Sequence, residues 1–218
     1  MEMCEPSRFI AEIPKDDVRH FGNPFNKDPE ASKDFGKSKM ANIIVKPLNG
    51  EAEIVADEFV VIEQGTDEAP VAVPADGKVL VHLSVWEANK AELSARAQAG
   101  ELGVYLNPDD NPEQLQGDVN VLKLIAFNFP VFKYGQGYSG AVLLRTRYGF
   151  TGEIRAFGDV WRDQFFYLAR CGFTQFDIKE GKSLEDALNA FADFTIPYQT
   201  SADGSLPVFN RRAAAAGA

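Results

Sequence analysis

The chain has 218 residues, of which 45% are hydrophobic, enough for one good core but not for two. Its net charge of −10 at pH 7 would repel phosphate backbones and anionic lipid, so we expect neither nucleic acid nor membrane partners. The sequence has no apolar run of membrane-spanning length, no secretion signal, and only two cysteines, which cannot make a disulfide framework. We therefore expect a cytoplasmic protein.

Three parts are expected along the chain. Residues 1–39 are broken by proline, glycine and charge, which predicts a disordered N-terminal extension, and Met40 is the expected native start. Residues 40–199 are expected to form a single α/β domain. Residues 200–218 are expected to be a flexible C-terminal tail.

Two β-like runs, at 42–46 and 58–63, predict a hairpin-like N-terminal piece. Beyond a loop with prolines, short apolar runs alternate with helical patterns. Ser84 and Asp159 are the expected N-caps of two helices, and Gly100, Gly149 and Gly172 end helices. The five expected strand–helix pairs are KVLVHL with SVWEANKAELSARAQAG, LGVYL with NPDDNPEQLQGDVNVL, KLIAFN with the segment from Tyr138 to Tyr148, EIRAF with VWRDQFFYLARC, and FTQFDI with SLEDALNAFADF.

This alternation predicts a mostly parallel sheet, because right-handed crossovers lay successive strands side by side. Five units are too few for a closed barrel of eight strands. The predicted fold class is therefore α/β, with a mostly parallel sheet built from about five βα units. An open three-layer sandwich is the expected arrangement, because the strands are continuous apolar runs, and a curled partial barrel is the alternative.

The segment GQGYSG, residues 135–140, has the glycine spacing of a dinucleotide-binding loop, and Asp159 stands where such a fold holds the ribose. However, FPVFKY separates the loop from the strand that ends near Asn128, and Pro130 cannot continue a sheet ladder. The turn is too long for a dinucleotide fingerprint, so no cofactor is expected. Backbone N–H groups at the start of the next helix can still bind an anion, or Ser139 caps that helix.

Ligands of open parallel sheets bind beyond the carboxyl ends of the strands, so the loop before Ser139 and the turn at Gly158 are expected on one rim. Arg155 lies in a buried strand and needs a partner, Asp159 or Asp163; the pair either holds an anionic ligand or is structural. Asp159 is either a general acid/base or an N-cap. The ligand-binding candidates are Gly135, Gln136, Gly137, Tyr138, Ser139, Arg145, Arg155, Asp159 and Gln164.

No catalytic residue can be assigned from these patterns. The two histidines lie far apart in the sequence, and His82 is expected to be a packed strand residue. Cys171 is expected beside a helix C-terminus, where the helix dipole raises the pKa of a thiol and makes it a poor nucleophile. No metal site is expected, because neither cysteine stands in a ligand spacing.

From Leu124 to Phe176 the chain contains IAFNFPVFKYGQGYSGAVLLRTRYGFTGEIRAFGDVWRDQFFYLARCGF. This resembles the bacterial domain-of-unknown-function family 934, whose members look like IAxxFPxFxDGRGYSxAxLLRxRxGYxGELRAxGDVLxDQLxFxxRCGF. Tyr198 and Gln199 resemble the family's ending, and weaker likeness covers most of residues 40–199. Where the family has Asp-Gly-Arg-Gly, this chain has YGQG, so Gln136 replaces an arginine that could bind an anion bidentately. Gly140 replaces a larger apolar residue.

The resemblance implies a setting in sulfur assimilation, because genes of this family tend to lie beside those of assimilatory sulfite or nitrite-type reductases. It implies an accessory protein of assimilatory sulfite reduction and cysteine biosynthesis, non-catalytic, that docks to sulfite reductase or its electron donor. The alternative is a small-molecule enzyme or binding module for a sulfur-containing or other anionic ligand at the crevice of the sheet. Whether the protein is an enzyme stays open.

Overall fold

The computed structural model describes residues 42–63, 72–195 and 197–216. The chain divides into two units, 1–34 and 35–218, and every described residue belongs to the second. The predicted extension over 1–39 and the expected start at Met40 therefore lie outside the described residues.

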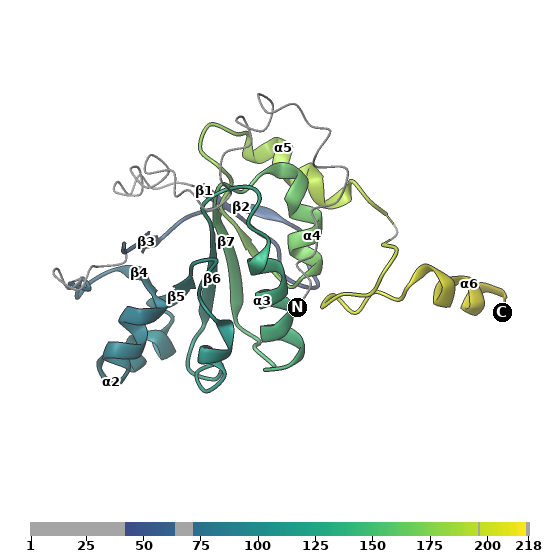
Figure 1. The fold of residues 1–218 in the computed structure, drawn as a ribbon. Coiled ribbons are helices and arrows are strands. Elements are labelled where there is room, and N and C mark those ends of the chain that lie inside the picture. Colours follow the sequence, from purple (N-terminus) through teal and green to yellow (C-terminus); the bar gives the residue numbers. More distant parts are fainter. Residues whose placement is uncertain (1–41, 64–71, 196, 217–218) are drawn as a thin grey trace, which may run out of the picture. The chain divides into compact units, whose positions relative to one another are not determined.

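Eight strands form one sheet in the order β2-β1-β8-β7-β6-β5-β4-β3 (Figure 1). The strands are β1 Asn42–Val45, β2 Glu53–Ala56, β3 Phe59–Val61, β4 Lys78–His82, β5 Leu102–Leu106, β6 Leu124–Phe129, β7 Glu153–Gly158 and β8 Gln175–Phe176. The helices are α2 Leu83–Ala99, α3 Gln136–Thr146, α4 Phe165–Arg170, α5 Leu184–Asn189 and α6 Val208–Ala216, with short 3-10 helices η1 Pro112–Leu115, η2 Arg162–Gln164 and η3 Ala190–Ala192.

The parallel part of the sheet follows the predicted alternation of strands and helices. From β3 to β8, the five pairs of consecutive strands are parallel, and a helical segment follows each strand from β4 to β8. The predicted helix ends are also found, with Gly100, Gly149 and Gly172 all at positive φ. The two predicted N-caps are wrong. His82 caps α2 in place of Ser84, and Trp161 precedes η2 in place of Asp159.

The hairpin-like N-terminal piece is present, but with a different second strand. β1 pairs antiparallel with β2, so that Ile44 lies opposite Ile54, whereas the sequence predicted a connector there. The run predicted as its partner forms β3, which pairs in parallel with β4 at the other edge of the sheet. β1 also pairs antiparallel with β8.

Only two residues, Asp57 and Glu58, separate β2 from β3, although these strands form opposite edges of the sheet. Three Cα–Cα steps span at most about 11 Å. The sheet therefore curls until its edges approach, and the segment from β2 to β3 crosses between them (Figure 1). The result is a curled half-barrel, the alternative that the sequence allowed, rather than the open three-layer sandwich.

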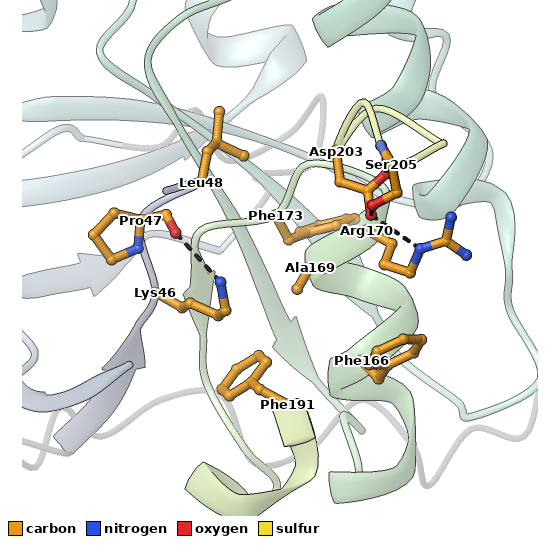
Figure 2. Close-up of a pocket in the computed structure, with 10 residues that line it drawn as sticks. All are labelled: Lys46, Pro47, Leu48, Phe166, Ala169, Arg170, Phe173, Phe191, Asp203 and Ser205. Carbon is orange, nitrogen blue, oxygen red and sulfur yellow. Dashed lines mark hydrogen bonds and ion pairs between the residues drawn. The ribbon is translucent and has the colours of Figure 1, made fainter. Parts of the chain in front are cut away.

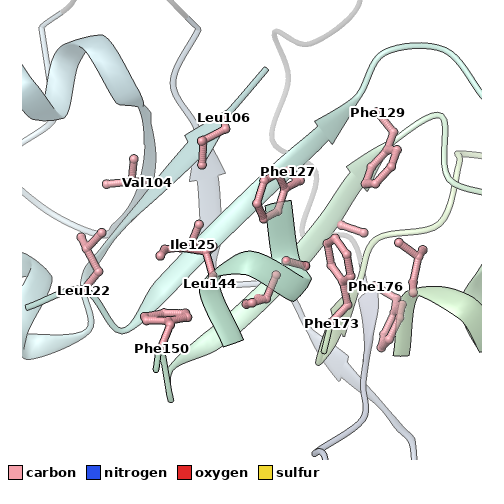
Figure 3. Packing of buried hydrophobic residues seen from close by; sticks show 14 of the residues in the cluster. Val104, Leu106, Leu122, Ile125, Phe127, Phe129, Leu144, Phe150, Phe173 and Phe176 are labelled. Atoms are coloured by element: carbon pink, nitrogen blue, oxygen red, sulfur yellow. The ribbon is translucent and has the colours of Figure 1, made fainter. Parts of the chain in front are cut away.

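The two faces of the sheet have different cores. Apolar side chains of α2, α3, α4 and α5 pack with one set of alternating strand residues, which includes Val104, Ile125 and Phe127 (Figure 3). The opposite set forms a smaller cluster of Leu80, Tyr105, Leu124, Ala126 and Phe157, joined by side chains of β3 and by no helix among the described residues. The helices thus cover the outer face, and the inner face of the half-barrel keeps room for polar groups.

The segment after residue 199, expected to be a flexible tail, contacts α4 in the structure. The Nε of Arg170 lies 3.0 Å from Oδ2 of Asp203, and the backbone N–H of Asp203 donates to the carbonyl oxygen of Arg170 at 3.2 Å. In the described part of the chain, no helix is both long enough and apolar enough to cross a membrane.

Candidate functional site

The predicted common rim exists at the carboxyl edge of the parallel strands. The backbone N–H of Asp159 donates to the carbonyl oxygen of Phe129 at 2.6 Å, which places the end of β7 beside the end of β6. Gly137, in the first turn of α3, packs against the ring of the same phenylalanine. The segments around Gly137 and Asp159 therefore open on the same side of the sheet.

Two of the three glycines in the 135–140 segment, Gly137 and Gly140, serve packing. A Cβ added to Gly137 would lie 2.7 Å from Cζ of Phe129, and one added to Gly140 would lie 2.6 Å from Cε1 of Phe127. At these distances a side chain would force the helix away from the sheet. Gly135 meets no atom within 4 Å. The spacing that resembles a dinucleotide loop is therefore explained by the close approach of α3 to two phenylalanines of β6.

A small pocket of about 40 Å³ opens at this rim, and two of the predicted candidates, Gln136 and Gly137, line it. Asn107 and Asn128 form its polar wall, with Nδ2 of Asn128 donating to Oδ1 of Asn107 at 2.9 Å. The Oδ1 atom of Asn128 is buried and has no hydrogen-bond partner among the described residues. A pocket of this size takes a water molecule rather than a metabolite.

The same rim contains a His–Asp pair that the sequence analysis did not assign. Nε2 of His82 lies 2.8 Å from Oδ2 of Asp110, and the histidine side chain is buried. The backbone N–H of Ser84 donates to Nδ1 of His82, so the ring carries its proton on Nε2 and donates it to Asp110. The backbone N–H of Asn107 also donates to Asp110. This network caps α2 and ties the ends of β4 and β5 together.

Asp159 is held by groups from three loops, those that follow β6, β7 and β8. Its Oδ1 accepts from Nε1 of Trp161 at 2.7 Å and from Nζ of Lys179 at 2.8 Å, and its Oδ2 accepts from the backbone N–H of Phe132. Partial burial raises the pKa of this carboxyl, but the hydrogen bonds from Lys179 and Trp161 outweigh it and hold the pKa below its usual range. An ionised, saturated carboxylate is a poor general acid, and Asp159 is not an N-cap either.

Three further candidates lie together on the outer, helical side of the rim. Oε1 of Gln164 accepts from the backbone N–H of Trp161, and its side chain also bonds the hydroxyl of Tyr138. Burial raises the pKa of Tyr138 to about 12, so the phenol stays protonated. Tyr138 and Ser139 line a shallow groove of about 420 Å³ with Cys171, where burial raises the pKa of the thiol. None of these groups is activated for chemistry.

Arg145 lies away from the rim, where α3 ends and β7 begins. Its Nη1 donates to the carbonyl oxygens of Phe150 and Gly152 at 2.8 and 2.6 Å, and its Nε and Nη2 donate to that of Gly172 at 3.0 and 2.8 Å. Burial lowers the pKa of the guanidinium, and the carboxylate of Glu153 opposes this effect. Arg145 therefore holds two loops together through their backbones, the α3–β7 loop and the α4–β8 loop, and does not face a ligand site.

Arg155 points to the inner face of the half-barrel and is only 1% exposed. Its partner is Asp57, with Nη2 2.5 Å from Oδ2, rather than the predicted Asp159 or Asp163. Neither its Nε nor its Nη2 makes a hydrogen bond of good geometry with a described residue, so the contact with Asp57 is an ion pair by distance rather than a hydrogen bond. Burial raises the pKa of the neighbouring Asp177 to about 6; Arg155 lowers this pKa and Asp57 raises it. The interior thus holds one cation between two carboxyl groups.

The protein is therefore a curled α/β half-barrel, and the rim at the carboxyl ends of its parallel strands carries a hydrogen-bonded polar network. Within the described ranges, no three side chains of His, Cys, Asp or Glu gather closely enough to hold a metal ion. Residues 103–209 match the model of a family described as a bacterial protein of unknown function, DUF934. The resemblance noted in the sequence is thereby confirmed. No curated protein compared with the chain matches it.

Proposed function

We propose that this protein is a non-catalytic accessory of assimilatory sulfite reduction that docks to the sulfite reductase or to its electron donor. The setting in sulfur assimilation comes from the family resemblance, and a cytoplasmic location goes with it. Docking is supported by one observation in particular, a group of aromatic side chains with exposed members on α4 and just after η3.

This aromatic cluster consists of Phe166, Tyr167 and Phe194. The ring centroids of Phe166 and Phe194 are 5.0 Å apart, and those of Tyr167 and Phe194 are 6.2 Å apart. Tyr167 and Phe194 are 52% and 54% exposed. Adjacent exposed aromatic rings are costly to leave in water, and rings of this kind are the usual anchors of protein interfaces. The net charge of −10 favours a partner with a basic surface around the matching pocket.

The alternative, an enzyme or an anion-binding module at the rim, has weaker support. The rim pocket holds about 40 Å³. Its unpaired atom, Oδ1 of Asn128, is an acceptor, and the carboxylate of Asp110 lines the same space, so an anion would be repelled there. Gln136, which stands where the family has an arginine, adds no positive charge.

The test is affinity purification of the tagged protein from its native cells growing on sulfate. We expect enrichment of reductase subunits or of their electron donor. The double substitution Tyr167→Ala with Phe194→Ala should reduce this at least about tenfold, since central aromatic anchors are worth about 2 kcal/mol each. Phe132→Ala is the matched control, because Phe132 is 50% exposed but lies on the rim loop.

A genetic measurement tests the setting separately from the docking surface. Cells that lack the gene should require cysteine and should be rescued by sulfide but not by sulfite. Growth of these cells on sulfite would show that the protein has no part in this step, whereas purification without any reductase component would refute docking.

A further inference from the structure

A pocket of about 260 Å³, separate from the rim pocket, lies at the opposite end of the parallel strands, where β8 begins. The backbone N–H of Lys46, directly after β1, donates to the carbonyl oxygen of Thr174 at 2.8 Å and fixes one wall there. The pocket is lined by Lys46, Pro47, Leu48, Phe166, Ala169, Arg170, Phe173, Phe191, Asp203 and Ser205. Its volume is near the lower end of the range for small-molecule sites.

The walls of this pocket are aromatic and its charged groups are set against them (Figure 2). Nζ of Lys46 lies 5.8 Å from the ring centroid of Phe191, and Cζ of Arg170 lies 6.0 Å from that of Phe166. Phe173 is buried and belongs to the main core, so its ring is a fixed wall. Such a lining suits a flat apolar body that carries its polar group at one end.

The charge balance of the pocket is positive, although the protein as a whole is acidic. Oδ2 of Asp203 pairs with Nε of Arg170 at 3.0 Å, and the Asp203 carboxylate also accepts hydrogen bonds from the hydroxyl and the backbone N–H of Ser205. Burial raises its pKa, but these hydrogen bonds and the guanidinium more than offset this and lower it, so the carboxylate is ionised and saturated. Lys46 has only long contacts, 3.4 Å each, to the carbonyl oxygens of Pro47 and Gly50, and forms no ion pair with a described residue. Its ammonium group is therefore the uncompensated charge.

We propose that this pocket binds a small organic anion, a carboxylate or sulfonate on a flat apolar body, with Lys46 as the counter-ion and Phe173 and Phe191 against the body. Arg170 acts as a positioning residue, because it holds the wall formed by residues 203–205. The pocket adjoins the aromatic cluster, because Phe166 belongs to both, but the binding proposed here does not rest on the docking function.

The test uses the full chain, with benzoate as the probe, and measures binding by ligand-observed NMR or calorimetry. We expect saturable binding in the millimolar range, which is ordinary for a ligand of this size. Benzamide, which has the same shape without the charge, should bind at least about tenfold more weakly. Equal binding of benzoate and benzamide, or no saturation by either, would overturn the proposal.

Two substitutions locate the site. Lys46→Gln should weaken benzoate about tenfold, whereas Lys133→Gln should not, although Nζ of Lys133 also lies 5.8 Å from an aromatic ring, that of Tyr134. Ala169→Leu should fill the pocket and abolish binding while the protein still folds. Unchanged binding in both Lys46→Gln and Ala169→Leu would place benzoate elsewhere and refute the assignment. Because these variants leave Tyr167 and Phe194 unchanged, failure here is distinguishable from failure of docking.

Discussion

Arg155 on β7 and Asp57 in the link between β2 and β3 form an ion pair across the inside of the half-barrel, with Nη2 2.5 Å from Oδ2. The arginine is 1% exposed and the carboxylate side chain is 13% exposed. The pair ties the crossing segment to the middle of the sheet. The oddity of an arginine in a short apolar strand is thus explained by architecture, and a ligand is not needed to account for it.

Asp57→Asn should lower the free energy of unfolding by about 3 kcal/mol, because it leaves a buried guanidinium with incomplete compensation. Urea denaturation measures this. The matched control is Glu58→Gln at the next residue, which breaks the exposed pair between Glu58 and Lys78 and should cost less than about 1 kcal/mol. Equal losses in the two variants would contradict the structural role of the buried pair.

Asp177 should make stability depend on pH. Its pKa is raised in the folded protein to about 6, so the folded state keeps a proton that the unfolded state has already released. This group's contribution is greatest below the unfolded pKa and is lost as the pH rises through about 6. Arg155 and Asp57 are the charged groups that act on it.

The substitution Asp177→Asn removes this titration. From pH 4 to pH 8 the wild type should lose up to about 3 kcal/mol of unfolding free energy relative to the variant. This loss corresponds to a pKa shift of roughly two units. Chemical denaturation at the two pH values measures it. A difference that stays constant with pH would mean that Asp177 titrates normally.

Arg145→Lys should destabilise the protein by about 2 kcal/mol, although it preserves the charge. A lysine cannot reach three carbonyl groups in the forked geometry that joins Phe150, Gly152 and Gly172. Thermal unfolding measures the loss, and Arg147→Lys on the exposed side of the same helix end should change stability by less than about 0.5 kcal/mol. Normal stability of Arg145→Lys would contradict this structural role, and Arg145 would again be a candidate for ligand binding.

Gly137→Ala should cost about 1–3 kcal/mol, because its methyl group would meet the ring of Phe129 at 2.7 Å. Gly135→Ala should be close to neutral, since no atom lies within 4 Å of the added carbon. Denaturation of the two variants, side by side, measures whether the glycines serve packing. If both were neutral, α3 would not need its close approach to β6.

Much of the fold could be predicted because its signals are local. Apolar runs such as KVLVHL and IAFNF, and helix ends at glycines such as Gly100, lie within a few residues of the structure that they specify. β2 was missed because Glu53–Ala56 is only four residues long, and its apolar run of three residues, Ile54 to Ala56, is too short to stand out as a strand. The curl depends on the pairing of β3 with β4, which no local pattern reveals.

The candidate site shows the same contrast between features set by local sequence, which could be predicted, and features set by long-range contacts, which could not. The common rim of Gly137 and Asp159 follows from strand direction alone and was predicted correctly. The partner of Arg155 was not, because Asp57 lies far away in sequence and reaches the arginine only through the curl. His82, Asn107 and Asn128 were also missed, although each lies at or next to the carboxyl end of a predicted strand. Polar residues at successive strand ends were the signal that could have found them.

The pairing of β1 with β8 has a consequence for how the protein is made. Ile44 lies opposite Phe176, so a strand that leaves the ribosome early has to wait for about 130 further residues before one of its neighbours exists. During that time Ile43 and Ile44, both fully covered in the finished molecule, have only the short β2 to pair with. During synthesis the apolar side chains of Ile43 and Ile44 thus stay exposed for a long time. A chain that terminates before Phe176 has no β8 to cover them.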